Sequence, residues 1–259
     1  MATTDTRERI GSAGPPRRRR RKPRRGFVAG FIGVLGELLI TLGLLLGLFI
    51  VWQLWWTDVE AHRYQATVLD QWQREPDYVE APPQVAERRT DAPPVPDDRS
   101  QGEVMATLHI PRLGPDYNVS IAHGIGMDTV LNRGYIGHYP ETQLPGEVGN
   151  FATAAHRQSY GAPYRRIDEI RHGDELIVET ADAYLVYAVT DDEIVLPSQV
   201  EVLAPVPNRP GEQAEERYLT LTTCHPLFSA AQRWITYAEF EYWIDKNDGQ
   251  PEALIAGGD

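Results

Sequence analysis

The sequence has 259 residues, of which 24 % are charged, and its formal net charge is −12 at pH 7. That charge is unevenly distributed, because residues 1–26 carry ten basic and two acidic side chains, which leaves −20 on the other 233 residues. Cys224 is the only cysteine, so the composition excludes an internal disulfide framework and a zinc site built from several cysteines.

An apolar segment of 30 residues, 27–56, follows the basic run and contains one charged residue, Glu37. About 20 apolar residues suffice to cross a bilayer as a helix, and lipid offers the backbone no hydrogen-bond partners. Three tryptophans at the far end fit an interfacial aromatic belt, and the basic run predicts that residues 1–26 are a cytoplasmic tail. We therefore expect one uncleaved transmembrane helix, with the rest of the chain outside the cell.

Two other interpretations of this N-terminal region remain. A cleaved signal peptide usually has a shorter apolar region of about 7–15 residues, and no good Ala-x-Ala cleavage site follows residue 56. The basic run could bind nucleic acid, but beside a membrane span we expect the membrane as the partner and no nucleic acid.

Residues 57–102 are rich in proline and charge. Such a composition cannot bury a core and favours an extended chain, so we expect a flexible extracytoplasmic linker. Residues 58–74 are compatible with a continuation of the helix as far as Pro76.

A mainly β domain is expected at residues 103–245, with a C-terminal tail at 246–259, and it is large enough for one core. Alternating patterns predict strands at 105–110, 117–124, 149–156, 173–180, 183–196, 217–224 and 233–244. Short helical turns are expected at 128–134, 164–170 and 198–205. Strands at this spacing, separated by Pro/Gly turns, predict a sandwich or a barrel.

The strand before Cys224 indicates which way the thiol points. Side chains alternate between the two faces of a strand, so Leu219 and Leu221 share one face, which we expect to be the core. Thr222 and Cys224 then share the opposite face, where a buried, inert cysteine would be out of phase with the leucines. A nucleophilic cysteine needs a thiolate, which an adjacent histidine can supply.

His156 is the histidine best placed for that role. It ends the predicted strand 149–156, on the face of Ala154, whose small side chain leaves room for another chain to lie across it. His138 is the main competitor, in a Gly/Pro-rich loop, whereas His225 should point away from its neighbour Cys224. His109, His123 and His172 are further histidines of the domain, of which His172 is expected in a solvated turn.

Arg233 follows Cys224 by nine residues, at the start of the last predicted strand. If the two strands form a hairpin, Arg233 lies close to the thiol, and its guanidinium could donate to a developing oxyanion. A surface arginine in a turn is the alternative.

The segments "TLTTCHPLFSAAQR" (220–233) and "PGEVGNFATAAHR" (145–157) resemble the sortase family, and most closely the class E sortases of high-GC Gram-positive bacteria. The resemblance covers about residues 103–245. It implies an eight-stranded β-barrel with short helices, preceded by one N-terminal transmembrane helix. It also implies His156, Cys224 and Arg233 as the catalytic residues, in a reaction that requires no metal or other cofactor.

The activity implied by the resemblance is transpeptidation at a cell-wall sorting signal. The partners would be surface proteins that carry a Leu-Ala-x-Thr-Gly-like signal and the amine of a lipid-linked peptidoglycan precursor. We expect Tyr139, in the loop before the His156 strand, to bind substrate through its hydroxyl or else to pack on the barrel. Thr222, Thr223 and Ala154 are further substrate-binding candidates.

Two alternatives of other kinds are an extracellular L,D-transpeptidase or cysteine peptidase, and a non-enzymatic module tethered to the membrane. L,D-transpeptidases usually have Ser-x-Gly before the cysteine, where this chain has Thr-Thr, and papain-like peptidases place the cysteine before the histidine. Asp191, Asp192 and Glu193 could be taken for a calcium loop, but in so acidic a domain we expect a solvated turn at this bend in the strand.

Overall fold

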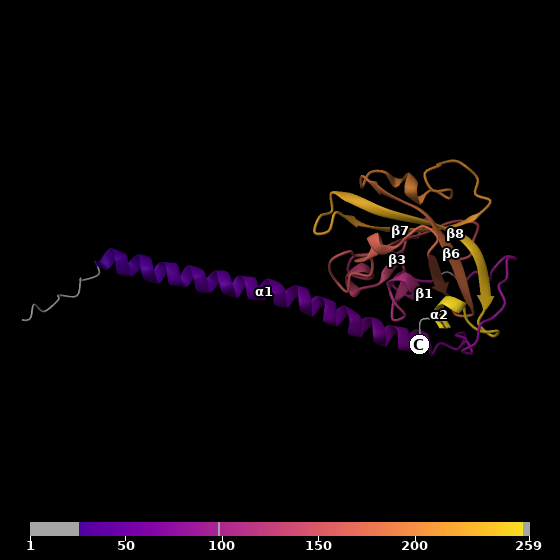
Figure 1. The fold of residues 1–259 in the computed structure, drawn as a ribbon, viewed down its shortest axis with the longest axis horizontal. Coiled ribbons are helices and arrows are strands. Elements are labelled where there is room, and N and C mark those ends of the chain that lie inside the picture. Colours follow the sequence, from indigo (N-terminus) through magenta and orange to yellow (C-terminus); the bar gives the residue numbers. More distant parts are fainter. Residues whose placement is uncertain (1–25, 98, 256–259) are drawn as a thin grey trace, which may run out of the picture. The chain divides into compact units, whose positions relative to one another are not determined.

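The structure, a computed structural model, describes residues 26–97 and 99–255. The basic tail expected at residues 1–26 therefore lies outside the described residues, except for Gly26. The described chain comprises one long helix, eight strands, several single turns of 3-10 helix and a short C-terminal helix (Figure 1).

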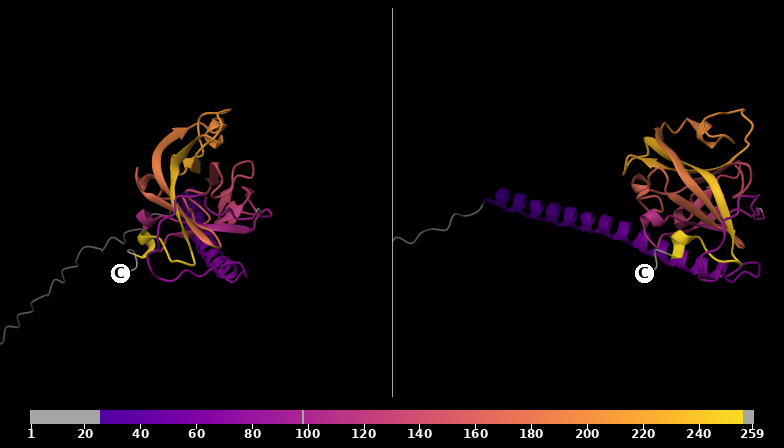
Figure 2. Two further views of the ribbon diagram at one scale, coloured as in Figure 1. Left: turned by 90° about the vertical axis from the view of Figure 1, so that its right-hand side faces the viewer. Right: turned by 45° about the vertical axis from the view of Figure 1, so that its right-hand side comes forward.

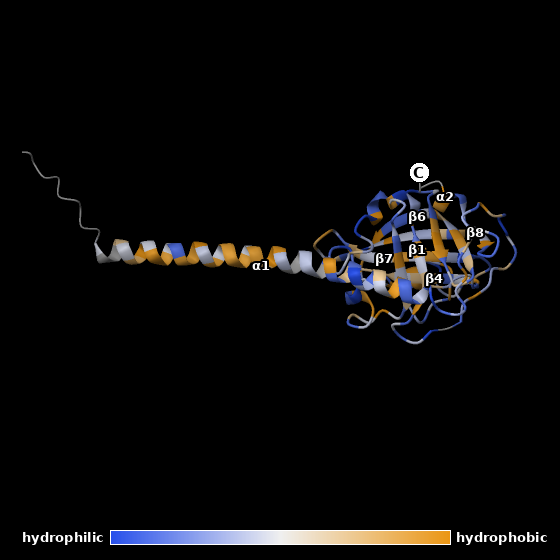
Figure 3. Cartoon of the chain, turned by 90° about the horizontal axis from the view of Figure 1, so that it is seen from below, coloured by the Kyte–Doolittle hydropathy of each residue, from blue (hydrophilic) through white to orange (hydrophobic). Residues whose placement is uncertain are grey.

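Helix α1 runs from Phe27 to Trp72 and contains 46 residues. Within the described residues, one helical stretch is long and apolar enough to cross a membrane: Ala29–Trp52 of α1, with a mean hydropathy of 2.5. Figure 3 shows this stretch as a mostly hydrophobic run, which gives way to mixed colours toward the end of the helix. The continuation of the helix beyond residue 57 is thus confirmed, and the helix ends before Pro76.

The strands close into a barrel, in the order β1-β2-β3-β4-β7-β8-β6-β5. Their bounds are Val104–His109 (β1), Asn118–His123 (β2), Ile136–His138 (β3), Gly149–Ala154 (β4), Glu175–Glu179 (β5), Ala183–Val195 (β6), Arg217–His225 (β7) and Gln232–Asp245 (β8). Two pairs are parallel, β2 with β3 and β4 with β7, and the others are antiparallel. Figure 2 shows the long strands β6 and β8 from two further directions. The expected eight-stranded barrel is confirmed.

Sequence patterning found seven of the eight strands and missed β3. This strand has only three residues, and its central Gly137 lies so close to the residue after β2 that an added Cβ would be 2.5 Å from the Gly124 carbonyl oxygen. The expected bend at Asp191–Asp192 corresponds to a shift in the β6–β8 register between Val189 and Asp191.

The helical turns predicted at 128–134, 164–170 and 198–205 are 3-10 turns at Leu131–Arg133, Ile167–Glu169 and Val200–Leu203. The first of them ends at Gly134, whose φ of 85° is in the left-handed region that glycine adopts without strain.

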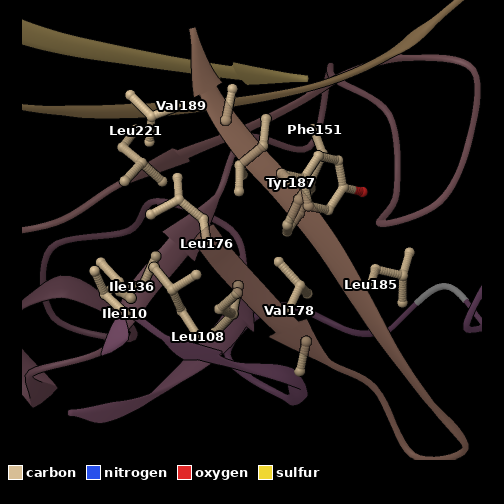
Figure 4. Close-up of a cluster of buried hydrophobic side chains, with 14 of the residues drawn as sticks. Leu108, Ile110, Ile136, Phe151, Leu176, Val178, Leu185, Tyr187, Val189 and Leu221 are labelled. Carbon is tan, nitrogen blue, oxygen red and sulfur yellow. The ribbon is translucent and has the colours of Figure 1, made fainter. Parts of the chain in front are cut away.

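Apolar side chains from nearly every strand fill the barrel. Figure 4 shows part of this core, including Leu108 of β1, Ile136 of β3, Phe151 of β4 and Leu221 of β7, which point toward one another. Each of these four side chains is at most 1 % exposed. Fully burying one such side chain contributes roughly 1.5–3 kcal/mol, so the alternation that sends them inward also fixes which residues face outward.

The segment between α1 and β1 differs from the flexible linker that we expected. The Val79 amide donates to the Ala181 carbonyl, and Arg89 and Trp243 exchange two backbone hydrogen bonds, of 2.8 and 2.9 Å. The Arg89 guanidinium also lies 4.0 Å from the centre of the Trp243 ring. These contacts join residues more than 100 positions apart, so proline-rich composition did not reveal them.

The C-terminal region also differs from expectation. Lys246 is fully buried, and the short helix α2, Glu252–Ile255, places Ala253 and Leu254 against an apolar cluster on the outer face of β5, β6 and β8. Among the described residues, 51–97 and 99–255 form one compact unit, and residues 26–50 belong to another. The described part of the expected tail therefore packs with the barrel.

A buried charge cluster joins the linker, β1, β5 and the C-terminal region. The Lys246 ammonium donates to Glu179 at 2.8 Å and lies 3.5 Å from the centre of the Tyr78 ring. Glu179 also accepts hydrogen bonds from His109 and from the Tyr78 hydroxyl, each at 2.7 Å. Burial by itself would raise the pKa of Glu179, but His109 and Lys246 outweigh it and lower the pKa to about 2.

This cluster predicts a specific loss of stability in acid. Because the folded-state pKa of Glu179 is depressed, its contribution is complete above the ordinary value of 4.5 and is lost as the pH falls toward about 2. The loss should amount to about 3 kcal/mol of unfolding free energy. The free energy of unfolding can be measured with urea on the full chain in detergent at a series of pH values. It should fall by this amount between pH 4.5 and 2 in wild type, and this fall should be absent in Glu179→Gln. If the unfolding free energies of the two proteins changed in parallel with pH, the loss could not be assigned to Glu179.

Candidate active site

Strand β7 brings the predicted site residues together, because it pairs with β4 on one side and with β8 on the other. In the parallel β4–β7 pair, Ala154 lies opposite Thr222. His156 and Cys224 each follow two residues later, so they lie at the same end of the two strands. In the antiparallel β7–β8 pair, Cys224 lies directly opposite Arg233.

The faces of β7 agree with the alternation of its sequence. Leu219 and Leu221 are at most 1 % exposed and belong to the barrel core. Cys224 is a half-buried free thiol, out of phase with these leucines. The prediction that the cysteine and the leucines occupy opposite faces is therefore confirmed.

His156 is held by two residues that the sequence did not reveal. Its Nε2 lies 3.0 Å from the Asn132 Oδ1, and its ring lies 5.3 Å from the Tyr160 ring, with 30° between the planes. A carboxamide oxygen only accepts hydrogen bonds, so Nε2 carries a proton and Nδ1 is the nitrogen that can exchange one. Burial lowers the pKa of His156, which favours the neutral imidazole.

The segments that carry Asn132 and Tyr160 both contact the second half of α1. Ala61 is 4 % exposed and packs beside Gly134 and Gly161, where an added Cβ would be 3.0 and 3.2 Å from the Ala61 Cβ. The Gly161 amide also donates to the carboxylate of Asp58 at 3.0 Å. Helix α1 thus contributes to the wall that supports His156.

Arg233 is half-buried, and its Nη1 donates to the carbonyl oxygens of Ala230 and Gln232 at 3.0 and 2.9 Å. These bonds direct the guanidinium toward the connection between β7 and β8. Among the described residues, no other group accepts a hydrogen bond from Arg233, so its Nε and Nη2 can donate to a substrate oxygen.

Tyr139 lies at the same face of the sheet. Its hydroxyl is 3.1 Å from the Thr222 Oγ1, and its amide donates to the Ala152 carbonyl. Thr222 is 4 % exposed and Ala154 is half-buried, both on the Cys224 side of their strands.

Thr223, which we expected among the substrate-binding residues, lies on the other face. Its hydroxyl donates to the Ala155 carbonyl at 2.7 Å, and its side chain is 3 % exposed. This bond continues the contact between β4 and β7 just beyond their ladder. The Thr223 side chain therefore connects strands on the inner side of the sheet, and a role of this residue in substrate binding stays a prediction.

The competing histidine, His138, is inside the barrel wall. It is 1 % exposed, its Nε2 lies 3.0 Å from the Gln143 carbonyl oxygen, and its ring packs 5.2 Å from Phe151. These contacts give His138 a structural role. His225 points away from the thiol as predicted, with its Nδ1 next to Arg157.

No group of three or more His, Cys, Asp or Glu side chains within residues 26–97 and 99–255 is arranged to hold a metal ion. In the acidic bend, Glu193 accepts hydrogen bonds from Asn208 and from the Tyr237 hydroxyl.

A groove of about 670 Å³ lies between the second half of α1 and the barrel, but Cys224, His156 and Arg233 do not line it.

The sequence comparisons identify the family of this chain. A model of the sortase domain matches residues 108–241. Sortase SrtE1 of Streptomyces coelicolor is 38 % identical over 248 residues, which cover 92 % of this chain and 64 % of SrtE1, so this chain spans less than two thirds of that relative. Sortase SrtE2 of the same organism is 37 % identical over 251 residues, which cover 92 % of both chains.

Solved structures give the same result. The SrtA sortase from Actinomyces oris has a TM-score of 0.62 and 48 % identity, and the match covers 64 % of this chain and 96 % of that one. Sortase E1 from Streptomyces coelicolor, solved with a tripeptide in the active site, has a TM-score of 0.55 and 41 % identity over 60 % of this chain and 99 % of its own. Because the domain model spans residues 108–241 and SrtE2 aligns over most of both sequences, this chain belongs to the sortase family of cysteine transpeptidases and resembles its class E members.

Proposed function

We propose that this chain cleaves a Leu-Ala-x-Thr-Gly-like sorting signal between Thr and Gly and joins the protein to an amine of a lipid-linked peptidoglycan precursor. The observation that carries this proposal is the position of Cys224, opposite Arg233 on β8 and at the strand end that leads to His156 on β4. Membership of the sortase family supports the reaction class, since sortases act on sorting signals and cell-wall precursors.

In the first step, the Cys224 sulfur attacks the threonine carbonyl carbon. The proton leaves the thiol for His156, and Arg233 donates to the oxyanion of the tetrahedral intermediate. The carbon–nitrogen bond to glycine then breaks, while His156 returns its proton to the leaving amine. The product is a thioester between Cys224 and the threonine.

In the second step, the precursor amine attacks the thioester and gives its proton to His156. Collapse of the intermediate forms the new amide and expels the Cys224 sulfur, which recovers a proton. Because burial lowers the pKa of His156, the neutral imidazole can accept a proton in either step near neutral pH.

In our proposal, this chemistry takes place at the cell surface. Helix α1 would cross the membrane once, with residues 1–26 in the cytoplasm and residues 103–245 outside. The basic residues before the span and the tryptophans after it support this orientation.

The nucleophile and its partners can be tested by mass spectrometry with labelled sorting peptides and an acceptor amine. Cys224→Ala should form no acyl-enzyme, and His156→Ala should lose at least the roughly 10²–10⁴-fold typical of proton transfer. Arg233→Lys should also be impaired, since a point charge replaces a planar donor. Arg217→Lys, at the other end of β7, is the matched control and should stay active. Turnover by Cys224→Ala within tenfold of wild type would remove the thiol from the mechanism.

The orientation is tested with a reporter that is active only when exported. Fused after Asp259, it should be active, and protease added to protoplasts should remove the domain; fused at Met1, it should be inactive. An active reporter at Met1, or a protected domain, would contradict the proposed topology, since the cell-wall substrate would then be out of reach.

Tyr139 offers a test of substrate specificity. Proline has no backbone N–H, whereas the alanine of the signal can donate one to an acceptor such as the Tyr139 oxygen. Losing that bond costs roughly 1–3 kcal/mol, about tenfold or more in kcat/KM. Wild type should therefore prefer the Leu-Ala-x-Thr-Gly peptide over its Leu-Pro counterpart, and Tyr139→Phe should reduce the preference.

Thr222→Val is the matched control, because it removes the partner of the Tyr139 hydroxyl and keeps the hydroxyl itself. Equal rates for both peptides in wild type would reject the specificity proposal. A preference that persists unchanged in Tyr139→Phe would exclude Tyr139 as the acceptor.

A further inference from the structure

The residues that directly follow the three proposed catalytic residues form one cluster. Arg157 follows His156, His225 follows Cys224, and Trp234 follows Arg233. We call these three the Arg157 cluster. Strand alternation sends His225 and Trp234 to the face opposite Cys224 and Arg233, so the cluster lies behind the site.

Arg157 makes the central contacts of the cluster. Its Nη1 donates to the His225 Nδ1 at 2.9 Å, and its guanidinium carbon lies 5.4 Å from the centre of the Trp234 ring. The rings of His225 and Trp234 lie 5.5 Å apart. Outside the cluster, the Nη2 of Arg157 pairs with the Asp168 carboxylate at 3.2 Å.

These contacts lie where the backbone ladder between β4 and β7 has ended. The last pair of that ladder is Ala154 with Thr222, two residues before His156 and Cys224. Beyond it, three hydrogen bonds that involve side chains connect the two segments: the Thr223 hydroxyl donates to the Ala155 carbonyl, Arg157 donates to His225, and the Phe228 amide donates to the Gln158 carboxamide oxygen. The Arg157–His225 bond therefore joins the two residues that directly follow His156 and Cys224, the proposed acid–base group and nucleophile.

The burial and hydrogen bonding of Arg157 indicate that it contributes little to the free energy of folding. Its side chain is 5 % exposed, and its Nε has no hydrogen-bond partner among the described residues. A buried guanidinium that is not fully bonded loses much of its hydration, and apolar replacements of buried ionic groups are often neutral or stabilising. Its anionic partner Asp168 is 51 % exposed, so water can solvate that carboxylate if the arginine is removed.

We propose that Arg157 is a positioning residue for the transpeptidation proposed above. It fixes Cys224 relative to His156 by donating to His225, which must present an unprotonated Nδ1. The planar guanidinium bonds His225 through Nη1 and Asp168 through Nη2 at the same time, which a lysine ammonium cannot do in the same geometry.

The test uses the full chain in detergent and two readouts: the rate of Cys224 alkylation by iodoacetamide and the kinetics of peptide acylation. Arg157→Met should keep a melting temperature close to wild type while kcat for acylation falls by up to about 100-fold, with KM little changed. Alkylation should slow toward the rate of His156→Ala. Arg166→Met is the matched control, since Arg166 lies in the same loop, pairs with Glu169 and should leave both readouts unchanged.

Two further pairs separate geometry from charge. Arg157→Lys keeps the charge and should behave like Arg157→Met. His225→Asn places an acceptor oxygen near the position of Nδ1 and should retain most activity, whereas His225→Leu should lose it. Full activity in Arg157→Lys or Arg157→Met, or a fall in activity matched by a fall in folded protein, would overturn the positioning role.

Alkylation needs no peptide substrate, so it decides the role of Arg157 separately from the proposed function. A wild-type enzyme that transfers no sorting peptide would reject the proposed function. If Cys224 of that enzyme still reacted more slowly in Arg157→Met, the positioning role would stand.

Discussion

The two-sided pairing of β7 is the constraint on which the site depends. The strand is hydrogen-bonded in parallel to β4 and antiparallel to β8, so its register fixes three chain segments at once. A slip of one residue would turn Cys224 toward the core and Leu221 toward the site. The free energy of burying the leucines therefore also holds the thiol in place.

The two faces of the sheet at this end carry different groups. The outer face carries Cys224 and Arg233, and the inner face carries the Thr223 hydroxyl and the side chains of His225 and Trp234. Because neighbouring residues on a strand are covalently joined, a side chain fixed on the inner face limits the movement of its neighbour on the outer face. Cys224 and Arg233 are themselves half-buried, and the residues that follow them, His225 and Trp234, contact each other on the inner face.

The segments before β1 and after β8 belong to the same packed unit as the barrel. Lys246 and Glu179 form a buried ion pair, and Tyr78 of the linker donates a hydrogen bond to the same carboxylate. Ala61 of α1 packs beside Gly134 and Gly161, near the two residues that hold His156. The second half of α1 therefore packs against the loops that contain the neighbours of His156.

The sequence by itself determined the apolar segment, seven of the eight strands and the face of Cys224, because these depend on local periodicity and composition. The tertiary structure decided β3, the packing of the linker, the burial of Lys246, and the contacts of Asn132 and Arg157. A three-residue strand has too few positions to show alternation, and a hydrogen bond such as that between His156 and Asn132 joins segments 24 residues apart. Those contacts depend on which distant segments the closed barrel places side by side, and no local pattern in the chain encodes that.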